Sequence, residues 1–300
     1  MSGSSDIVIV WGEVLWDRLP SGDQLGGAPA NVAWHLGMAG GWAALVSRVG
    51  DDAAGRRAVE RLSAHVDTSL VQIDPERATG EVTVRLEGGE PRYTLHPGRA
   101  WERIACTDAV RGAIAEAGVL VYGTLAQRMP EGLAGWREAA RAAGPGCLRV
   151  YDLNLRPTEL HVPAIAEAIE LADVVKINDR ELAALRDLFG WADPLAALRR
   201  PAGARRRVVV VTHGAEGSTL HGDGAPIELL GVPAAPGGDN IGCGDAYLAI
   251  LVHGMTIGRD LAASGRAATR WAAAVAGARG ATPWFEDDQI AELLQPGPEP

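Results

Sequence analysis

The chain has 300 residues, of which 47% are hydrophobic and 22% charged, and its 28 basic and 38 acidic residues give a net charge of −10. A chain of this length buries a sizeable core without disulfides, and its acidic balance excludes the broad basic surface of a nucleic-acid binder. Its three cysteines form no C-x-x-C pair, and no apolar run reaches the roughly 18 residues of a membrane span. We therefore expect a cytoplasmic protein without nucleic-acid or membrane partners.

Short runs rich in valine and isoleucine alternate along the chain with longer alanine- and leucine-rich stretches, which predicts a series of β-α-β units. Near-continuous apolar strands are typical of a parallel sheet covered on both faces. The pattern therefore predicts an α/β fold, with a doubly wound sheet between two helical layers. The predicted strands are Ile7–Val10, Ala43–Val49, Val119–Tyr122, Leu148–Leu153, Val174–Ile177 and Val208–Val211. The predicted helices are Pro29–Ala39, Ala53–Ala64, Asp108–Ala117, Leu133–Ala143, Pro163–Ala172, Arg180–Leu188, Gly244–Met255 and Leu261–Ala276.

One stretch departs from this rhythm. Between Val71 and Tyr93 polar and apolar residues alternate, and Gly88-Gly89 marks a turn, which together predict a β-hairpin. We interpret it as part of a small antiparallel lid, mainly over residues 71–100 with a contribution from residues 14–25. The tail Gln295–Pro300 is predicted to be disordered.

Lys176 is the single lysine of the chain. A Walker A loop requires the pattern G-x-x-x-x-G-K-[ST], which this sequence lacks, so the chain is not a P-loop NTPase. The 38 glycines cluster instead at turns between apolar runs. We therefore expect backbone amides, and not lysine side chains, to hold any bound phosphate.

The most informative segment runs from Asp239 to Tyr247. Its glycines on either side of Cys243 directly precede a predicted helix, so free amides at the helix N-terminus can form an anion hole. Asp245 lies in the first turn of that helix, where it either complements the helix dipole or accepts a proton from a hydroxyl group. The combination of a carboxylate with an anion hole favours the second role, in phosphoryl transfer.

Cys243 leaves two alternatives open. The helix dipole and the neighbouring amides would favour its thiolate, which would make the side chain reactive toward alkylating agents. Alternatively, the thiol replaces a small apolar residue and is shielded by packing.

A second glycine-rich segment, Gly26–Ala33, joins a loop to a helix. Gly27 lets a small polar ligand approach the backbone and Asn31 offers it a donor and an acceptor, although an ordinary helix start is the alternative. Upstream, Glu13 and Asp17 follow the first strand at the edge where open α/β sheets bind ligands. Either acid can hold sugar hydroxyls or remain a solvated loop residue.

Three further strands are followed by residues suited to ligands. The N-x-x-E spacing of Asn178 and Glu181 suits the hydration shell of Mg²⁺, but a helix capping box has the same spacing. After the last of these strands, the hydroxyl group of Thr212 and the glycines Gly214 and Gly217 suit nucleotide phosphates, although a plain turn is the alternative. The residues are Asp152, Asn154 and Arg156 after one strand, Asn178 and Glu181 after the next, and Thr212, Gly214 and Gly217 after the third.

Together these segments resemble the PfkB carbohydrate kinases of the ribokinase superfamily, from Gly12 to about Pro283. Gly26–Ala33 looks like the first signature of that family, and Asp239–Tyr247 looks like its second, usually written D-T-x-G-A-G-D. The resemblance implies a single kinase domain over residues 1–300. It also implies a ribokinase-like three-layer α/β/α fold with a small β-sheet lid, ATP as phosphoryl donor, and Mg²⁺.

The resemblance implies a role for each matching residue. Asp245 would be the base, beside an anion hole formed by the amides of Gly242, Cys243 and Gly244. The sugar would be held by Asp17, Gly27 and Asn31, with Arg156 as a further candidate. Asn178 and Glu181 would hold Mg²⁺ through water, and Thr212, Gly214 and Gly217 would form a nucleotide loop. A monovalent cation such as K⁺ would be bound by carbonyl groups around Asp239 and Ile241.

Two positions depart from the family pattern, since Ile241 stands where Thr or Ser is common and Cys243 where Ala is usual. The first change removes a hydroxyl group near the triphosphate and weakens the expectation of a cation there. Other segments look most like the fructokinase branch, which implies a neutral ketohexose such as fructose. Kinases of 2-keto-3-deoxygluconate, nucleosides or sugar phosphates stay open, because Arg156 and other arginines can recognise an acidic group. We also expect a homodimer formed through the lid.

Two other functional classes fit the sequence less well. No G-x-G-x-x-G pattern follows the first strand, which argues against a dinucleotide-dependent oxidoreductase. A sugar-binding protein without catalysis would share the acids at the strand ends, but it needs no carboxylate beside an anion hole.

Overall fold

A computed structural model describes residues 6–19, 22–87, 90–156, 160–200 and 207–295. The predicted turn at Gly88-Gly89 and residues 296–300 of the predicted tail lie outside these ranges. No helix in the described ranges is long and apolar enough to cross a membrane.

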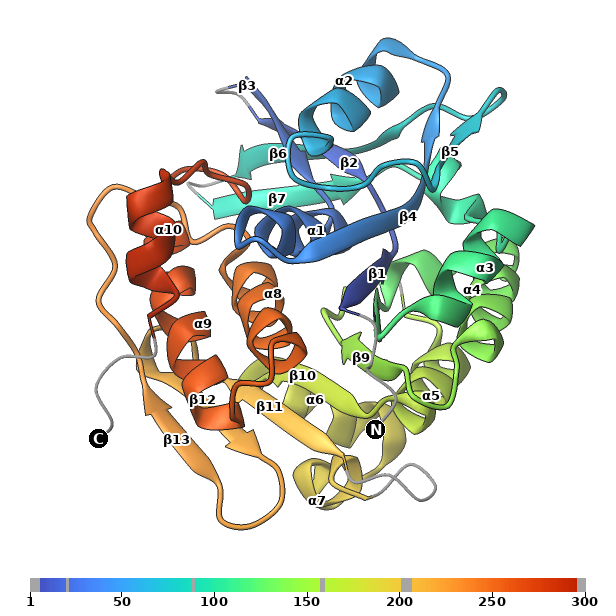
Figure 1. Cartoon of the computed structure of the whole chain (residues 1–300). Coiled ribbons are helices and arrows are strands. Elements are labelled where there is room, and N and C mark those ends of the chain that lie inside the picture. The colour runs from blue at the N-terminus through green and yellow to red at the C-terminus, as the bar shows by residue number, and fades with distance from the viewer. Residues whose placement is uncertain (1–5, 20–21, 88–89, 157–159, 201–206, 296–300) are drawn as a thin grey trace.

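The main sheet of the described chain has nine strands in the order β13-β12-β11-β10-β9-β8-β1-β4-β5 (Figure 1). Neighbouring strands from β5 to β11 run parallel, and β12 and β13 extend that edge as antiparallel strands. The strands are β1 (Ile7–Trp11), β4 (Trp42–Gly50), β5 (Val71–Asp74), β8 (Val119–Gly123), β9 (Leu148–Asp152), β10 (Val174–Asn178), β11 (Val208–Thr212), β12 (Gly217–His221) and β13 (Ile227–Leu230).

Helices cover both faces of this sheet, because successive side chains of each strand point to opposite sides. In β10, for example, Val174 joins the core under α8 and α9, whereas Val175 and Ile177 join the core on the other face. The predicted three-layer α/β/α architecture is confirmed. One layer contains α1 (Ala28–Met38), α2 (Ala53–Leu62), α8 (Cys243–Thr256), α9 (Leu261–Ala276) and α10 (Asp287–Leu293), and the other contains α3 (Asp108–Glu116), α4 (Pro130–Ala142), α5 (Val162–Leu171), α6 (Asp179–Phe189) and α7 (Pro194–Leu198).

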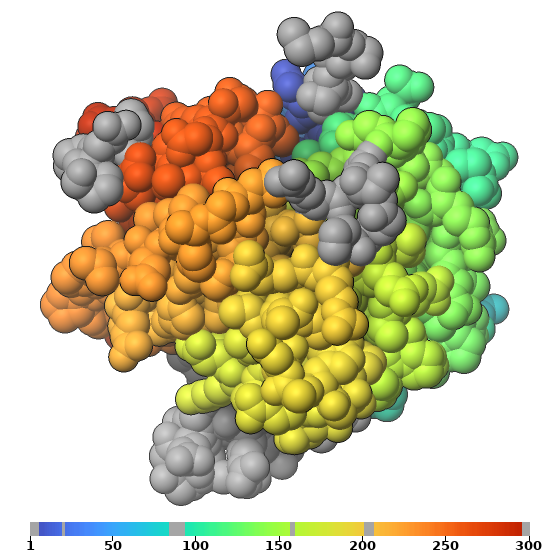
Figure 2. Space-filling view, turned by 90° about the horizontal axis from the view of Figure 1, so that it is seen from below, coloured from blue at the N-terminus to red at the C-terminus, as the bar shows by residue number. Residues whose placement is uncertain are grey.

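A second, four-stranded sheet has the order β3-β2-β6-β7 and lies at the end of the molecule drawn uppermost in Figure 1. The opposite end, seen from below in Figure 2, is formed by yellow and orange segments from the second half of the chain. The indole of Trp16 donates a hydrogen bond to the carbonyl oxygen of Ala54, over 3.0 Å, and thereby ties the small sheet to α2. The strands are β2 (Leu15–Leu19), β3 (Gly22–Gly26), β6 (Gly80–Glu87) and β7 (Glu90–Leu95).

The small sheet differs in two respects from the predicted antiparallel lid. Residues Val71–Asp74 form β5 at the edge of the main sheet, beside β4, because Pro75 lacks the amide needed to continue the ladder and separates them from β6. The pairs β2–β3 and β6–β7 are antiparallel as predicted, but β2 and β6 run parallel. A parallel pair needs a long crossover, and α1, β4, α2 and β5 supply it.

At Gly37, helix α1 packs closely on the backbone of His65, in the segment that precedes β5. A Cβ atom on Gly37 would overlap the carbonyl oxygen of His65, so the approach depends on glycine. We expect Gly37→Ala to lower the free energy of unfolding by about 1–3 kcal/mol, the usual effect of overpacking. Urea denaturation measures this change.

The matched control is Gly112→Ala, since Gly112 lies exposed in α3 with open space around its missing Cβ. Alanine there should raise the free energy of unfolding by up to about 1 kcal/mol through helix propensity. Equal urea midpoints for the two variants would contradict the close approach.

Candidate active site

The predicted functional segments follow strands at the carboxyl edge of the main sheet. Glu13 follows β1, Arg156 follows β9, Asn178 ends β10 and Thr212 ends β11. These strands are parallel, so their carboxyl ends meet at one edge. This is the edge where open α/β sheets bind ligands.

Helix α8 begins at this edge with a glycine that no other residue can replace without strain. Gly242 caps the helix in a left-handed conformation, with φ 76°, and a Cβ atom there would lie 2.7 Å from the Cα atom of Ala281. The first amides of a helix have no intrahelical partner. The predicted anion hole at Gly242, Cys243 and Gly244 thus lies at a helix N-terminus, and its role stays a prediction.

Asp245 lies in the first turn of α8, and Asn31 lies in the first turns of α1. The Asn31 amide donates a hydrogen bond of 2.8 Å to the Asp245 carboxylate, so residues 214 positions apart meet at the site. Burial, together with the nearby carboxylate of Asp152, raises the pKa of Asp245 to about 6 against the opposing charge of the Lys176 ammonium. Asp245 is thus a buried carboxylate suited to accept a proton near neutral pH.

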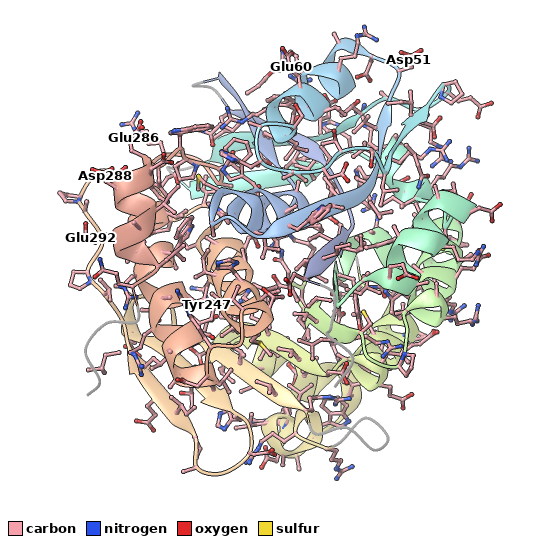
Figure 3. All side chains as sticks on the ribbon, in the orientation of Figure 1. Asp51, Glu60, Tyr247, Glu286, Asp288 and Glu292 are labelled. Carbon is pink, nitrogen blue, oxygen red and sulfur yellow. The ribbon has the colours of Figure 1, made fainter. Side chains whose placement is uncertain are left out.

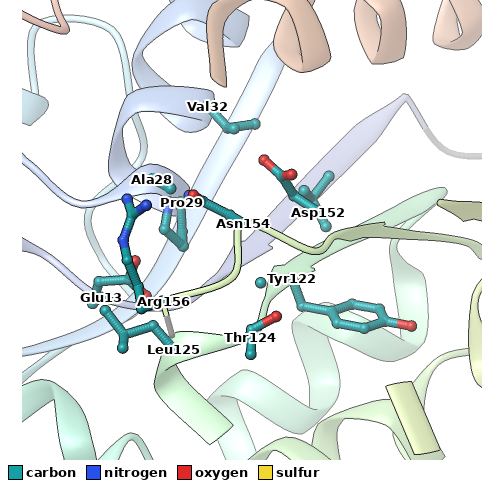
Figure 4. Close-up of a pocket in the computed structure, with 12 residues that line it drawn as sticks. Glu13, Ala28, Pro29, Val32, Tyr122, Thr124, Leu125, Asp152, Asn154 and Arg156 are labelled. Carbon is teal, nitrogen blue, oxygen red and sulfur yellow. The ribbon is translucent and has the colours of Figure 1, made fainter. Parts of the chain in front are cut away.

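A small pocket, here called the polar pocket because half of its twelve lining residues are polar, lies at this edge of the sheet (Figure 4). Two of those residues, Glu13 and Asp152, interact electrostatically with Asp245. Burial raises the pKa of Glu13 to about 7, and the charge of Asp245 adds to the effect. The Oε2 atom of Glu13 and the Oδ1 atom of Asn31 are buried without a hydrogen-bond partner among the described residues. Hydroxyl groups of a ligand would satisfy such acceptors. The polar residues lining the pocket are Glu13, Tyr122, Thr124, Asp152, Asn154 and Arg156.

The predicted sugar residues Asp17, Gly27 and Asn31 do not line this pocket, although Asp17 and Gly27 lie near residues that do. Burial raises the pKa of Asp17 to about 6, while the positive charge of Arg156 lowers it, so these two side chains interact electrostatically. Gly27 has φ 103°, and a Cβ atom there would overlap the carbonyl oxygen of Glu13. Glycine therefore permits the approach of the α1 start to the loop after β1.

On the other side of the α8 N-terminus lies a larger cleft with a volume of about 530 Å³. The predicted nucleotide residues Thr212, Gly214 and Gly217 line it, together with Cys243 and Gly244. Two residues of the predicted anion hole, Cys243 and Gly244, therefore line a nucleotide-sized cleft, and the next residue, Asp245, interacts electrostatically with Asp152 of the polar pocket. Tyr247, labelled in Figure 3, also lines the cleft, and its hydroxyl group is 2.8 Å from the Ser218 hydroxyl group.

The N-x-x-E motif forms the capping box that the sequence left open as an alternative. The Asn178 side chain accepts a hydrogen bond from the amide of Glu181, and the Glu181 carboxylate accepts one from the amide of Asn178. Its other oxygen accepts a bond of 2.8 Å from the amide of Leu155. Each carboxylate oxygen keeps a further lone pair, so the donor set suits contact with metal-bound water better than direct ligation.

Asp239 connects two loops near the start of α8. Its carboxylate accepts hydrogen bonds from the amides of Ile241, over 3.2 Å, and Gly280, over 2.9 Å. Within the described residues, no group of three or more His, Cys, Asp or Glu side chains is placed to hold a metal ion. The monovalent cation at the carbonyl groups around Asp239 and Ile241 stays a prediction.

Sequence reasoning gave no role to Lys176, Tyr122, Thr124 or Tyr247. The available signal for Lys176 was a charged residue inside the apolar run Val174–Ile177. Tyr122 and Thr124 belong to the segment Tyr122–Arg128, which resembles the fructokinase branch but assigned neither residue a role, and Tyr247 lies inside a predicted helix.

Comparison with known proteins agrees with this geometry. Residues 22–288 match the model of the pfkB family of carbohydrate kinases. The chain belongs to the pfkB family. A fructokinase-1 of Oryza sativa is 30% identical over 84% of this chain and 84% of its own. An uncharacterised sugar kinase of Pyrococcus horikoshii is 28% identical over 90% of this chain and 86% of its own, and its structure in complex with ATP superposes with a TM-score of 0.82, at 25% identity over 95% and 97% of the two chains.

Membership of the pfkB family confirms the resemblance read from the two glycine-rich segments. The structural match confirms the ribokinase-like fold, and the activity is that of a carbohydrate kinase, which transfers a phosphoryl group to an alcohol.

Cys243 does not have the environment of a reactive thiol in this pfkB kinase. Burial raises the pKa of its thiol to about 11, and the carboxylates of Asp245 and Asp239 raise it further. These effects outweigh the helix N-terminus, which the sequence had suggested would favour the thiolate. The thiol is half-buried and lines the larger cleft, so packing shields it only in part.

We expect iodoacetamide to modify Cys243 about a hundredfold more slowly at pH 7.5 than an ordinary cysteine of pKa near 8.5. The rate should rise about tenfold per pH unit up to the pKa of the thiol, because only the thiolate reacts. Peptide mapping by mass spectrometry measures the rate, with Cys243→Ala as the control. Rapid labelling of Cys243 at pH 7.5 would restore the reactive-thiol hypothesis.

Proposed function

We propose that this pfkB kinase phosphorylates a ketohexose, with fructose as its first candidate, and uses ATP as the donor. The observation that carries the proposal is the position of Asp245, which directly follows Gly244 of the larger cleft and interacts electrostatically with Glu13 and Asp152 of the polar pocket. The rice relative is a fructokinase, and the Pyrococcus sugar kinase binds ATP in its structure. Both facts support the assignment of the pocket to sugar and of the cleft to nucleotide.

The polar pocket would bind the sugar through hydroxyl groups. Glu13, Asp17 and Asn31 supply acceptors from three different elements, and Arg156 supplies a donor at the rim. The backbone at Gly27 approaches the same region. A neutral sugar needs no net positive charge in its pocket, and the acids here outnumber the single arginine.

In the proposed reaction, a sugar hydroxyl oxygen attacks the γ-phosphorus of ATP. Its proton passes to the carboxylate of Asp245 as the new O–P bond forms. The bond between the γ-phosphorus and the bridging oxygen breaks, and ADP leaves with its electron pair. The amides of Gly242, Cys243 and Gly244 stabilise charge on the phosphoryl oxygens during the transfer.

Magnesium belongs to the proposal because Asn178 and Glu181 suit contact with metal-bound water. When bound, the ion neutralises part of the charge of the triphosphate. The carboxylate of Glu181 is already held by two backbone amides. It would orient the water shell without moving.

A coupled assay of ADP formation tests this function with fructose, other sugars, 2-keto-3-deoxygluconate and nucleosides. We expect fructose to give the highest kcat/KM, and Asp245→Asn to lower kcat about 10²–10⁴-fold because it removes the general base. Activity should fall as the pH drops through about 6, since protonation of Asp245 removes its basicity and its pKa is near 6.

The control is Asp288→Asn, an exposed side chain on the outer surface of α10 (Figure 3), which should leave kcat unchanged. Fructose binding by calorimetry should be similar in the wild type and the Asp245 variant. A kcat of Asp245→Asn within threefold of the wild type would remove Asp245 from the mechanism. A clear preference for 2-keto-3-deoxygluconate would assign Arg156 to a substrate carboxylate and reject the ketohexose.

The small sheet is the proposed lid over the sugar. Its strand β2 carries Asp17, which interacts with Arg156 at the pocket. Closure of such a lid excludes water and limits wasteful hydrolysis of ATP. The expected homodimer through this sheet, a cytoplasmic location and the monovalent cation stay predictions, and sedimentation equilibrium measures the first.

We expect saturating fructose to slow amide hydrogen exchange in β6 and β7, because a closed lid opens less often. Mass spectrometry of peptides from residues 80–95 measures the rate, and α3 serves as a control remote from the small sheet. The lid assignment fails when exchange in these strands is the same with and without sugar.

A further inference from the structure

Lys176 occupies a position in β10 that the fold would otherwise give to an apolar residue. Its neighbours Val175 and Ile177 point into the core on the opposite face, so the side chain of Lys176 points toward the α8 side of the sheet with that of Val174. The residue is only 6% exposed. The single lysine of the chain is therefore buried beneath the helix that begins at the anion hole.

The ammonium of Lys176 is paired with the carboxylate of Asp152 on the adjacent strand, β9. The two residues are partners in the parallel register, and the Nζ atom lies 2.9 Å from Oδ1 and 3.2 Å from Oδ2. A buried ion pair of this kind contributes little net stability compared with apolar residues of similar volume. Stability therefore does not account for a charged pair at this point of the core.

The location of the pair points to a role in the reaction. The Nζ atom lies 3.1 Å from the point that a Cβ atom on Gly244 would occupy, so the ammonium is packed against the anion hole. Gly244 lines the larger cleft, and Asp152 lines the polar pocket. The ion pair thus bridges the two cavities between which the phosphoryl group must pass.

The ammonium of Lys176 has a hydrogen-bond donor left for another anion. Lys176 interacts electrostatically with Asp245 and Glu181 as well as with Asp152. An ammonium has three donors, and among the described residues its hydrogen bonds go to Asp152 alone. One donor thus remains for an oxygen atom arriving at Gly244.

We propose that Lys176 is a catalytic residue whose ammonium contacts the phosphoryl group during its transfer across the anion hole, while Asp152 positions it. The inference rests on the proposed phosphoryl transfer. Lys176 stays protonated throughout and exchanges no proton with the substrates, since Asp245 takes the proton of the sugar. Its full positive charge adds to the partial positive charges of the backbone amides. It also offsets the negative charges of the three nearby carboxylates, which would otherwise repel the phosphoryl group.

The proposal also explains why position 244 carries glycine. Gly244 has no left-handed conformation that would demand glycine. A Cβ atom there would instead press on the Lys176 ammonium at 3.1 Å, which is closer than nearly all ordinary contacts. A side chain at 244 would displace the ammonium from the hole.

The test compares Lys176→Met/Asp152→Asn with Asp152→Asn alone. The single variant Lys176→Met would leave Asp152 buried without its partner, which can prevent folding. In Asp152→Asn the ammonium of Lys176 loses its partner but keeps the nearby charges of Asp245 and Glu181, and the double variant leaves neither member of the pair charged. We expect kcat of the double variant to be at least about 10²-fold below that of Asp152→Asn, as for the loss of one charge-stabilising donor. A difference of less than threefold would overturn the proposal.

A second measurement separates catalysis from structure. Calorimetry gives the dissociation constant of ADP with fructose, alone and with aluminium fluoride, which mimics the transferred phosphoryl group. Aluminium fluoride should lower the dissociation constant of ADP in both variants, but by a factor at least tenfold smaller in the double variant than in Asp152→Asn. Without aluminium fluoride, ADP should bind both variants with similar dissociation constants. A purely structural role would weaken both complexes equally and would refute catalysis by Lys176.

The outcomes also distinguish this inference from the proposed function. When the wild type and Asp152→Asn form ADP with fructose and the double variant matches them, only the role of Lys176 is wrong. When the wild type forms no ADP with any sugar, the proposed function is wrong, and the catalytic role of Lys176 falls with it.

Discussion

The hydrogen bond between Asn31 and Asp245 joins the N-terminal turns of α1 and α8, and the geometry of the site depends on this contact. One turn further along α1, His35 supports the same arrangement. Its Nδ1 atom accepts a hydrogen bond from the indole of Trp271, and its Nε2 atom is 2.9 Å from the carbonyl oxygen of Ala281. Burial lowers the pKa of His35 to about 4, so the neutral ring donates from Nε2 at physiological pH. Helix α1 thereby holds both Asp245 and the loop packed against Gly242.

A common physical cause sets the electrostatics of the site. Burial raises the pKa values of Glu13, Asp17 and Asp245, because a carboxylate loses hydration when it enters the interior. Lys176 and Arg156 are the cations that offset this cost at Asp245. The resulting site combines a basic carboxylate with positive charge, as transfer of a phosphoryl group requires.

Local patterns were sufficient for the parallel strands at the centre of the main sheet, because each of these strands is an apolar run whose two faces are both buried. They failed where pairing depends on distant segments. Val71–Asp74 has the alternation of a hairpin strand, yet it pairs with β4 because α2 returns the chain to that edge. The strands β12 and β13 were not predicted, since each has only four or five residues and mixes polar with apolar ones, which gives little hydrophobic signal.

The sequence alone was enough to place Asp245 at a helix N-terminus, since glycines before a helical run produce that geometry locally. It also indicated the pfkB family, because the two glycine-rich segments are short and continuous. Only the tertiary structure decided that Asn31 reaches Asp245, that Glu13 is buried at the pocket, and that Lys176 lies against Gly244. These relations join residues from different strands and helices, and their distances follow from sheet register and helix packing, which no local pattern encodes.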